Sequence, residues 1–188
     1  MKTRSTNITI RDMVYAAVFT AALCAVAPFA INIGPIPLTF ATLVIYLATG
    51  TLGWKLGALS TALYVALGAV GVPVFSNFQG GFHVIAGATG GFIIGYVPCA
   101  LVAGLVIQAL KGKILANVLG MAIGTILLYA CGTAWFMFLT GNPLAASLAA
   151  CVTPFLPGDA IKISLACIAA PKLRAALGAY RKADTGQT

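Results

Sequence analysis

Acidic side chains are nearly absent from this sequence. Only three of its 188 residues are Asp or Glu, and charged residues of both signs make up 7% of the chain. Soluble domains carry roughly 25% charged residues, which keep their surfaces in water. With 61% hydrophobic residues and a mean hydropathy of +1.03, the chain is instead typical of an integral membrane protein.

Side chains that bind metals or phosphates are also scarce. The single histidine, His83, cannot form a cluster, and none of the five cysteines forms a C-x-x-C pair. Because most of the cysteines lie within apolar runs, we expect small, buried, reduced side chains. The sequence therefore predicts no metal site and no cofactor. It also lacks a Walker motif, so any ATP hydrolysis must come from partner subunits.

Apolar runs fill most of the chain, at about residues 13–30, 40–52, 56–70, 87–110, 114–139 and 158–171. A helix of about 20 residues crosses the hydrocarbon core of a bilayer. We therefore predict an all-α integral membrane protein with six transmembrane helices in one domain, 1–188, without room for a soluble catalytic module. The first run continues without a small-x-small cleavage site, so we expect a retained helix rather than a signal peptide.

The basic residues fall at alternate connections between these runs. Ten of the eleven basic residues lie in four places. These are the segment before the first run, the turn at Lys55, the turn at 111–113 and the tail from Lys172 onward. The other connections, 31–39, 71–83 and 140–157, contain none. By the positive-inside rule, both termini are predicted to be cytoplasmic. The net charge of +8 is then a topology signal rather than a sign of nucleic-acid binding, and Lys162 is its one exception.

One acidic residue lies within the hydrophobic body. Asp12 precedes the first run and Asp184 lies in the polar tail, whereas Asp159 opens the last run, with Lys162 three residues later. An ionisable pair in a membrane is expensive and indicates a functional site, here at the outer mouth. The alternative is an N-cap aspartate with a local lysine partner, worth ~1 kcal/mol. As a binding pair, a carboxylate accepting N–H bonds and an ammonium donating to a carbonyl fit a cyclic urea, an amide or a pterin-like edge.

The outer connections and their flanking runs add candidate ligand contacts. Amide groups suited to a carboxylate come from Asn77, Gln79, Gly80 and Gly81, and candidates for an apolar wall are Tyr129 and Trp135. Packing is the simpler explanation for each of them alone. The apolar connection containing Pro35, Pro37 and Thr39 is either a lid that folds onto the protein or a tight reverse turn.

The first run carries small residues four apart, at Ala17, Ala21 and Ala25. This spacing allows another helix to approach closely. The sequence leaves open whether that helix belongs to this chain or to a partner.

Nearly the whole chain resembles the BioY family, the biotin-binding S components of energy-coupling-factor (ECF) vitamin transporters. Besides the Ala-rich first run, the motifs that carry the resemblance are Gly34–Thr39, Gly71–Phe75, Gly87–Phe92, Tyr129 to Trp135 and, most specific, Pro154–Lys162. The resemblance implies an S-component-like helical bundle in a prokaryotic cytoplasmic membrane. It also implies high-affinity capture of biotin from outside and association with a transmembrane coupling subunit and two ATPase subunits.

The resemblance also implies roles for individual residues. Asp159 and Lys162 are expected to contact biotin, with the carboxylate accepting the ureido N–H groups and the ammonium donating to the ureido carbonyl. The loop asparagine of the family corresponds to Asn77. With the candidates found from the residues themselves, the expected biotin-binding set is Asp159, Lys162, Asn77, Gln79, Gly80, Gly81, Gly91, Trp135 and Tyr129. The small-residue stripe Ala17, Ala21 and Ala25 is expected to contact the coupling subunit.

Two other functions remain open at this point. A standalone secondary transporter would use protonation of Asp159 to couple uptake to an ion gradient. A small intramembrane enzyme would need His83 to act with Ser76 or Asp159, although no spacing motif joins them.

Overall fold

The computed structural model describes residues 9–32, 34–110 and 114–184, with side chains described up to residue 178. Its long helices are α1 (Ile10–Val26), α2 (Ala41–Leu52), α3 (Trp54–Ala69), α5 (Gly90–Ala109), α6 (Ile114–Thr140) and α8 (Leu156–Asp184). Shorter elements are the strands β1 (Ala30–Asn32) and β2 (Pro37–Thr39), the 3₁₀ turn η1 (Ser76–Phe78), and the helices α4 (Phe82–Ala86) and α7 (Leu144–Cys151).

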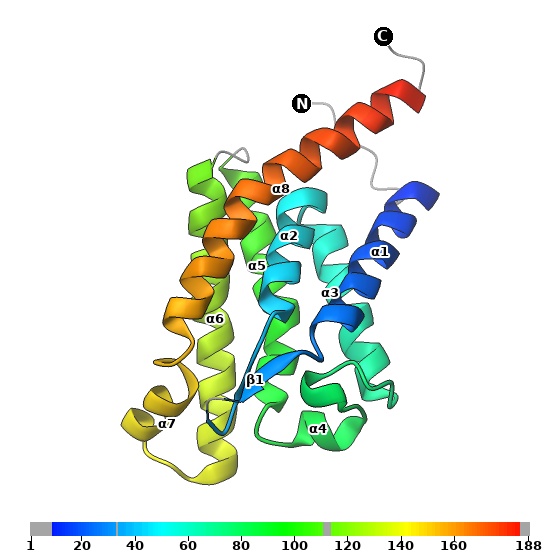
Figure 1. The fold of residues 1–188 in the computed structure, drawn as a ribbon. Coiled ribbons are helices and arrows are strands. Elements are labelled where there is room, and N and C mark those ends of the chain that lie inside the picture. The colour runs from blue at the N-terminus through cyan, green and yellow to red at the C-terminus, as the bar shows by residue number, and fades with distance from the viewer. Residues whose placement is uncertain (1–8, 33, 111–113, 185–188) are drawn as a thin grey trace.

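The long helices form a bundle with two distinct ends (Figure 1). The hairpin end carries the antiparallel β1–β2 hairpin together with α4 and α7. The terminal end carries the start of α1, the end of α8 and the tight turn between α2 and α3. Gly53 makes that turn with a φ of +87°, a conformation that favours glycine.

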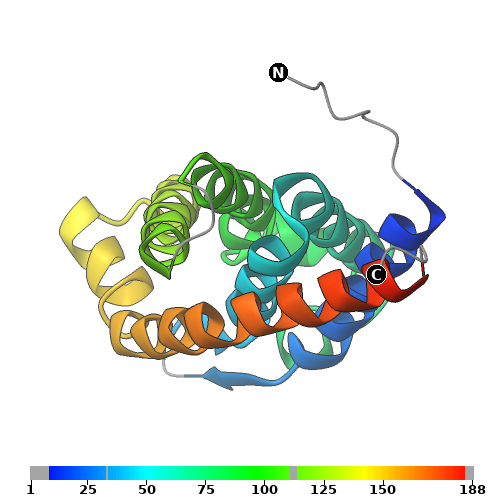
Figure 2. The ribbon, with the colours of Figure 1, turned by 90° about the horizontal axis from the view of Figure 1, so that it is seen from above.

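Helix α2 is the centre of the bundle. It packs against α1, α3, α5 and α8, and nine of its twelve residues are buried. Viewed down the bundle, α2 lies between α8 on one side and α5 on the other (Figure 2). Side chains on α2 can therefore reach several helices at once.

Helices α5 and α6 pack closely because glycines lie between them. A Cβ atom at Gly120 would lie 2.7 Å from the carbonyl oxygen of Ala103 on α5. At Gly132 it would lie 2.4 Å from the ring of Phe92. Larger residues at these positions would push the two helices apart, since interiors are packed at crystal-like density.

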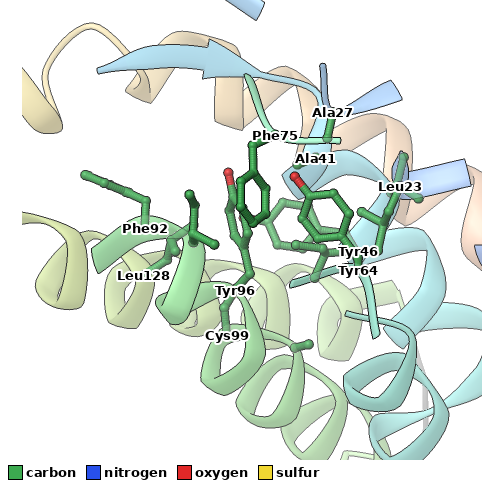
Figure 3. Packing of buried hydrophobic residues seen from close by; sticks show 14 of the residues in the cluster. Leu23, Ala27, Ala41, Tyr46, Tyr64, Phe75, Phe92, Tyr96, Cys99 and Leu128 are labelled. Carbon is green, nitrogen blue, oxygen red and sulfur yellow. The ribbon is translucent and has the colours of Figure 1, made fainter. Parts of the chain in front are cut away.

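An aromatic cluster forms the core beneath the hairpin end (Figure 3). The ring of Tyr64 lies 5.7 Å from that of Phe75 and 6.4 Å from that of Tyr96, measured between centroids. All three residues are buried. The loop after α3 thereby joins the core of α3 and α5, which fixes the floor beneath the hairpin.

The bundle agrees with the helical expectation and adds detail to it. Each of the six predicted ranges overlaps one long helix, and α8 continues well beyond residue 171. The expectation of an all-α protein missed the small β hairpin, and the short helices α4 and α7 lie in segments predicted as loops.

Membrane-spanning length is established for only part of the bundle. Helices α5 and α6 have 20 and 27 residues and hydropathies of 2.1 and 2.0, and α7 with α8, bent by 48°, forms a third candidate. Helices α1, α2 and α3 have 17, 12 and 16 residues. The chain is a membrane protein, whereas the six-span count and the orientation stay predictions. Side chains used for that orientation at Lys2, Arg4, Lys111, Lys113, Arg181 and Lys182 lie outside the described residues.

Candidate functional site

The first two turns of α8 present Asp159 and Lys162 on one face. The helix begins at Leu156, and the backbone N–H of Asp159 donates to the carbonyl of Phe155 over 2.8 Å. Asp159 is therefore inside the helix rather than at its N-cap. Residues three apart on a helix face the same way, and here both side chains point into the bundle, each residue being 5% exposed.

The Asp159 carboxylate is held by three side chains from three helices. Lys162 Nζ lies 2.9 Å from Oδ1, and the hydroxyl of Tyr129 on α6 donates to Oδ2 over 2.5 Å. The hydroxyl of Thr42 on α2 donates to Oδ1 over a longer 3.5 Å. Hydrogen bonds to a charged acceptor are about twice as strong as neutral ones, which offsets part of the cost of burying the charge.

Lys162 also fastens the hairpin to the bundle. Its ammonium donates to the backbone carbonyl of Thr39, in β2, over 2.7 Å. The Thr39 hydroxyl in turn lies 3.4 Å from the hydroxyl of Tyr96 on α5. The end of β2 is thus bonded to both α8 and α5, so the hairpin covers the ion pair.

A cavity of about 40 Å³, the hairpin cavity, lies beneath β2 and next to this pair. It is lined by Ile36, Pro37, Leu38, Thr39, Thr42, Phe92, Tyr96, Leu128, Tyr129, Phe155, Asp159 and Lys162. Apart from the polar cluster, these side chains are apolar or aromatic. Pockets for drug-sized ligands measure ~300–1,000 Å³, so the hairpin cavity is smaller than such a pocket.

Several residues predicted from the sequence meet at this cavity. Asp159, Lys162 and Tyr129 line it, as do Pro37 and Thr39 of the expected lid. Pro35 is exposed in the hairpin turn and does not line the cavity. The segment predicted as either a lid or a reverse turn is therefore a hairpin that roofs the cavity.

The predicted amide contacts lie elsewhere in this structure. Asn77 is exposed and exchanges side-chain hydrogen bonds with Asn32, at 3.1 and 3.5 Å. Gln79 is exposed, and the backbone N–H of Gly81 donates to the carbonyl of Gly68 over 2.6 Å. Neither these residues nor Gly80 lines the hairpin cavity. Their binding roles stay predictions.

Gly91 and Trp135 form a packing contact between α5 and α6. A Cβ atom at Gly91 would lie 2.2 Å from that of Trp135, so a side chain there is excluded. The indole N–H of Trp135 donates to the carbonyl of Gly87 over 2.9 Å, which fixes the start of α5. Neither residue lines the cavity as described, so contact with a ligand stays a prediction for both.

The small-residue stripe on α1 faces away from the bundle. Ala17, Ala21 and Ala25 are exposed, whereas Ala16 and Thr20, on the neighbouring side of the helix, are buried. Packing against this chain's own helices therefore does not explain the stripe.

Sequence reasoning missed the contribution of α2 and α5. Thr42 and Tyr96 hydrogen-bond within the polar cluster, and Phe92 supplies part of its wall. Their only signal in the sequence is a polar or aromatic residue inside an apolar run. His83 is exposed in α4 and outside the cavity lining, so it is not assembled with Asp159.

Known proteins share this chain's sequence pattern over most of its length. The BioY family model matches residues 1–179. The chain belongs to the BioY family. "Biotin transporter BioY" of Thermotoga maritima is 34% identical over 165 residues, which cover 88% of this chain and 96% of that protein. The "Probable biotin transporter BioY" of Pyrococcus horikoshii is 36% identical, over 87% and 96% of the two chains.

A solved structure has the same fold. The crystal structure of the S-component for biotin from an ECF-type ABC transporter superposes with a TM-score of 0.82. The two sequences are 27% identical, and the match covers 92% of this chain and 95% of that one. The BioY fold therefore extends over the whole bundle, including the helices that carry the hairpin cavity.

Proposed function

We propose that this chain is the biotin-binding membrane subunit of an ECF transporter, which captures biotin from outside the cell and delivers it to the cytoplasm. The observation that carries the proposal is the buried Asp159–Lys162 pair beneath the hairpin of a BioY-family bundle. Its role is substrate binding rather than catalysis, and ATP hydrolysis belongs to partner subunits.

Biotin matches the hairpin cavity in chemical type. Its ureido ring has two N–H donors and one carbonyl, which suit a carboxylate acceptor and an ammonium donor. Its thiophane ring is apolar, as are Phe92, Leu128 and Phe155 in the cavity lining. Lys162 has three N–H donors; bonds to Asp159 and Thr39 use two, so one remains for the ureido carbonyl.

The cavity volume implies a conformational step. At about 40 Å³ the hairpin cavity is too small for a ligand of biotin's size, so we expect it to widen before biotin binds. Because β2 is bonded to Lys162 at Thr39, lifting the hairpin breaks that bond and opens the path to Asp159. Capture then consists of hairpin opening, biotin entry and reclosure.

Delivery requires the coupling module. The exposed stripe Ala17, Ala21 and Ala25 suits close approach by a helix of a transmembrane coupling subunit, which works with two ATPase subunits. In this arrangement six helices cross the prokaryotic cytoplasmic membrane, with both termini in the cytoplasm and the hairpin end outside. Lys55 is in the first turn of α3, which begins at the terminal end, and Lys172 and Arg174 lie in the second half of α8, which ends there. Basic residues at this end fit the positive-inside rule with the terminal end in the cytoplasm.

Binding measurements on Asp159→Asn test the proposal. The substitution keeps the shape of the side chain but replaces one acceptor oxygen with a donor, so biotin affinity is expected to fall by more than about tenfold, or ~1.4 kcal/mol. Titration calorimetry on the purified protein gives the affinity, and Thr140→Val at the exposed end of α6 serves as the matched control. Unchanged biotin affinity in Asp159→Asn would refute the assignment.

A further inference from the structure

A second cavity opens at the terminal end of the bundle. This terminal cavity measures about 180 Å³ and is lined by Asp12, Tyr15, Thr51, Leu52, Leu56, Arg174, Leu177 and Gly178. These residues come from α1, α2, α3 and α8. The terminal cavity is larger than the hairpin cavity, and the proposed binding of biotin makes no use of it.

Thr51 brings to the lining of the terminal cavity a buried hydroxyl without a hydrogen-bond partner in the part of the chain that the structure describes. Several buried helical threonines donate their hydroxyl to the carbonyl four residues earlier, as Thr61 does to Gly57 and Thr125 to Met121, over 2.8 and 2.7 Å. Thr133 in α6 has no such bond, but it does not line either cavity. Thr51 is 8% exposed, and its hydroxyl has no hydrogen-bond partner among the described residues. A buried hydroxyl without a partner lowers stability, so a ligand that bonds to it gains affinity.

Arg174 adds a positive charge, held in a fixed orientation, to the same cavity lining. Its Nε donates to the carbonyl of Gly50 over 2.9 Å, and its Nη2 donates to the same oxygen. Gly50 permits this close approach of α8 because a Cβ atom there would lie 2.6 Å from that of Ala170. A guanidinium has five N–H groups, so the rest of the fork can bind a further acceptor.

The remaining lining is amphipathic. Tyr15 adds an aromatic ring and a hydroxyl, and Leu52, Leu56 and Leu177 add apolar surface. Asp12 is the one acid in the lining, and its carboxylate accepts hydrogen bonds from the N–H and hydroxyl of Thr9 at the start of α1.

We propose that the terminal cavity binds the phosphate and glycerol region of a membrane phospholipid, through Arg174, Thr51 and Tyr15, with the acyl chains leaving over the leucines. Arginine and hydroxyl donors suit phosphate oxygens. Basic pockets between membrane helices on the cytoplasmic side are typical lipid head-group sites. A cavity of this volume is too small for a helix, whose diameter is ~10–12 Å, so a lipid suits it better than a partner helix.

The proposal is tested with Thr51→Val, which removes the hydroxyl and keeps the shape of the side chain. Delipidated protein in detergent is titrated with short-chain phosphatidylethanolamine, and bound lipid is counted by native mass spectrometry while the Tm is followed. Wild-type protein is expected to bind one lipid and gain Tm. Thr51→Val is expected to match or exceed the lipid-free Tm of the wild type, yet bind the lipid about tenfold more weakly. Arg174→Gln is expected to lose binding.

Matched controls are Lys172→Gln, an exposed basic residue on the same helix, and Thr140→Val, whose hydroxyl bonds to Phe136 at the other end. Both are expected to bind lipid as the wild type does. Wild-type lipid affinity in Thr51→Val would overturn the proposal, as would equal protection by soluble phosphoethanolamine. So would weakened assembly with the coupling subunit in Thr51→Val while lipid binding is unchanged. Biotin affinity of the terminal-cavity variants, measured in parallel, is expected to stay constant. A negative result for lipid binding would therefore leave the proposed function intact.

Discussion

Helices α2 and α8 each line both cavities, but the two cavities differ in whether their buried polar side chains have hydrogen-bond partners. At the hairpin end, Asp159 and Lys162 are bonded to each other and to Tyr129 and Thr39. At the terminal end, the hydroxyl of Thr51 is buried without a partner among the described residues. The cavities measure about 40 and 180 Å³.

The difference follows from the cost of burying each kind of group. An unpaired charge in a low-dielectric interior costs several kcal/mol, so Asp159 must have partners even when no ligand is bound. A neutral hydroxyl without a partner costs only ~1–3 kcal/mol, which a folded protein tolerates. A buried ion pair is therefore bonded even when no ligand is present, and a ligand there must exchange bonds. A buried neutral hydroxyl can remain without a partner until a ligand binds.

Removing the lysine is expected to produce the largest change. Lys162→Met leaves Asp159 buried without its counter-ion and releases Thr39, so we expect a loss of ~3–5 kcal/mol in unfolding free energy together with loss of biotin binding. Unfolding in a denaturing detergent, followed by circular dichroism, measures the stability. Lys162→Met is thus expected to lower the stability, whereas Thr51→Val at the terminal end is expected to leave it unchanged or raise it.

The double variant Asp159→Asn/Lys162→Met is the control for that experiment. Because neither charge remains, most of the lost stability is expected to return, whereas biotin binding is not. If Lys162→Met alone were as stable as the wild type, the contrast between the buried ion pair and the buried neutral hydroxyl would not hold.

Local patterns in the sequence were sufficient to predict the ion pair. Asp159 and Lys162 are three residues apart in one apolar run, so helical geometry alone puts them on one face. The apolar runs likewise predicted the long helices, because hydropathy is averaged over many residues. Family membership, also inferred from motifs, was confirmed by the match over residues 1–179.

Contacts between distant segments could not be predicted in this way. Thr42, Tyr96 and Thr39 reach the pair only because α2, α5 and the hairpin converge on α8. Helices α4 and α7, with five and eight residues, are too short to give a distinct hydropathy signal. Nor did the sequence indicate that the Thr51 hydroxyl lacks a hydrogen-bond partner among the described residues, since a helical threonine normally bonds to its own helix.

An intermediate loss of stability is expected at the α5–α6 contact near the hairpin end. This variant distinguishes a residue that only supports the fold from one that contacts the ligand. Gly91→Ala puts a Cβ atom within 2.2 Å of Trp135, so we expect ~1–3 kcal/mol of destabilisation from overpacking. Biotin affinity of the folded protein is expected to stay within about twofold. Gly34→Ala is the matched control, because a Cβ atom there meets nothing within 4 Å. Lost affinity at unchanged stability would instead support the predicted ligand contact of Gly91.

The smallest effect is expected where the hairpin meets the loop after α3. Asn32 and Asn77 bond to each other through their amides, and Asn77 N donates to the carbonyl of Pro28 over 2.9 Å. If this pair only holds the base of the hairpin, Asn32→Ala and Asn77→Ala should each lower the unfolding free energy by ~0.5–1.5 kcal/mol. The two losses should be non-additive in the double variant, because both remove the same interaction. Both variants should have similar biotin affinities. Asn77→Gly controls for the backbone, since Asn77 has a φ of +59° that glycine adopts without strain. A loss of affinity confined to the Asn77 variants would show that Asn77 leaves Asn32 and contacts biotin once the hairpin moves.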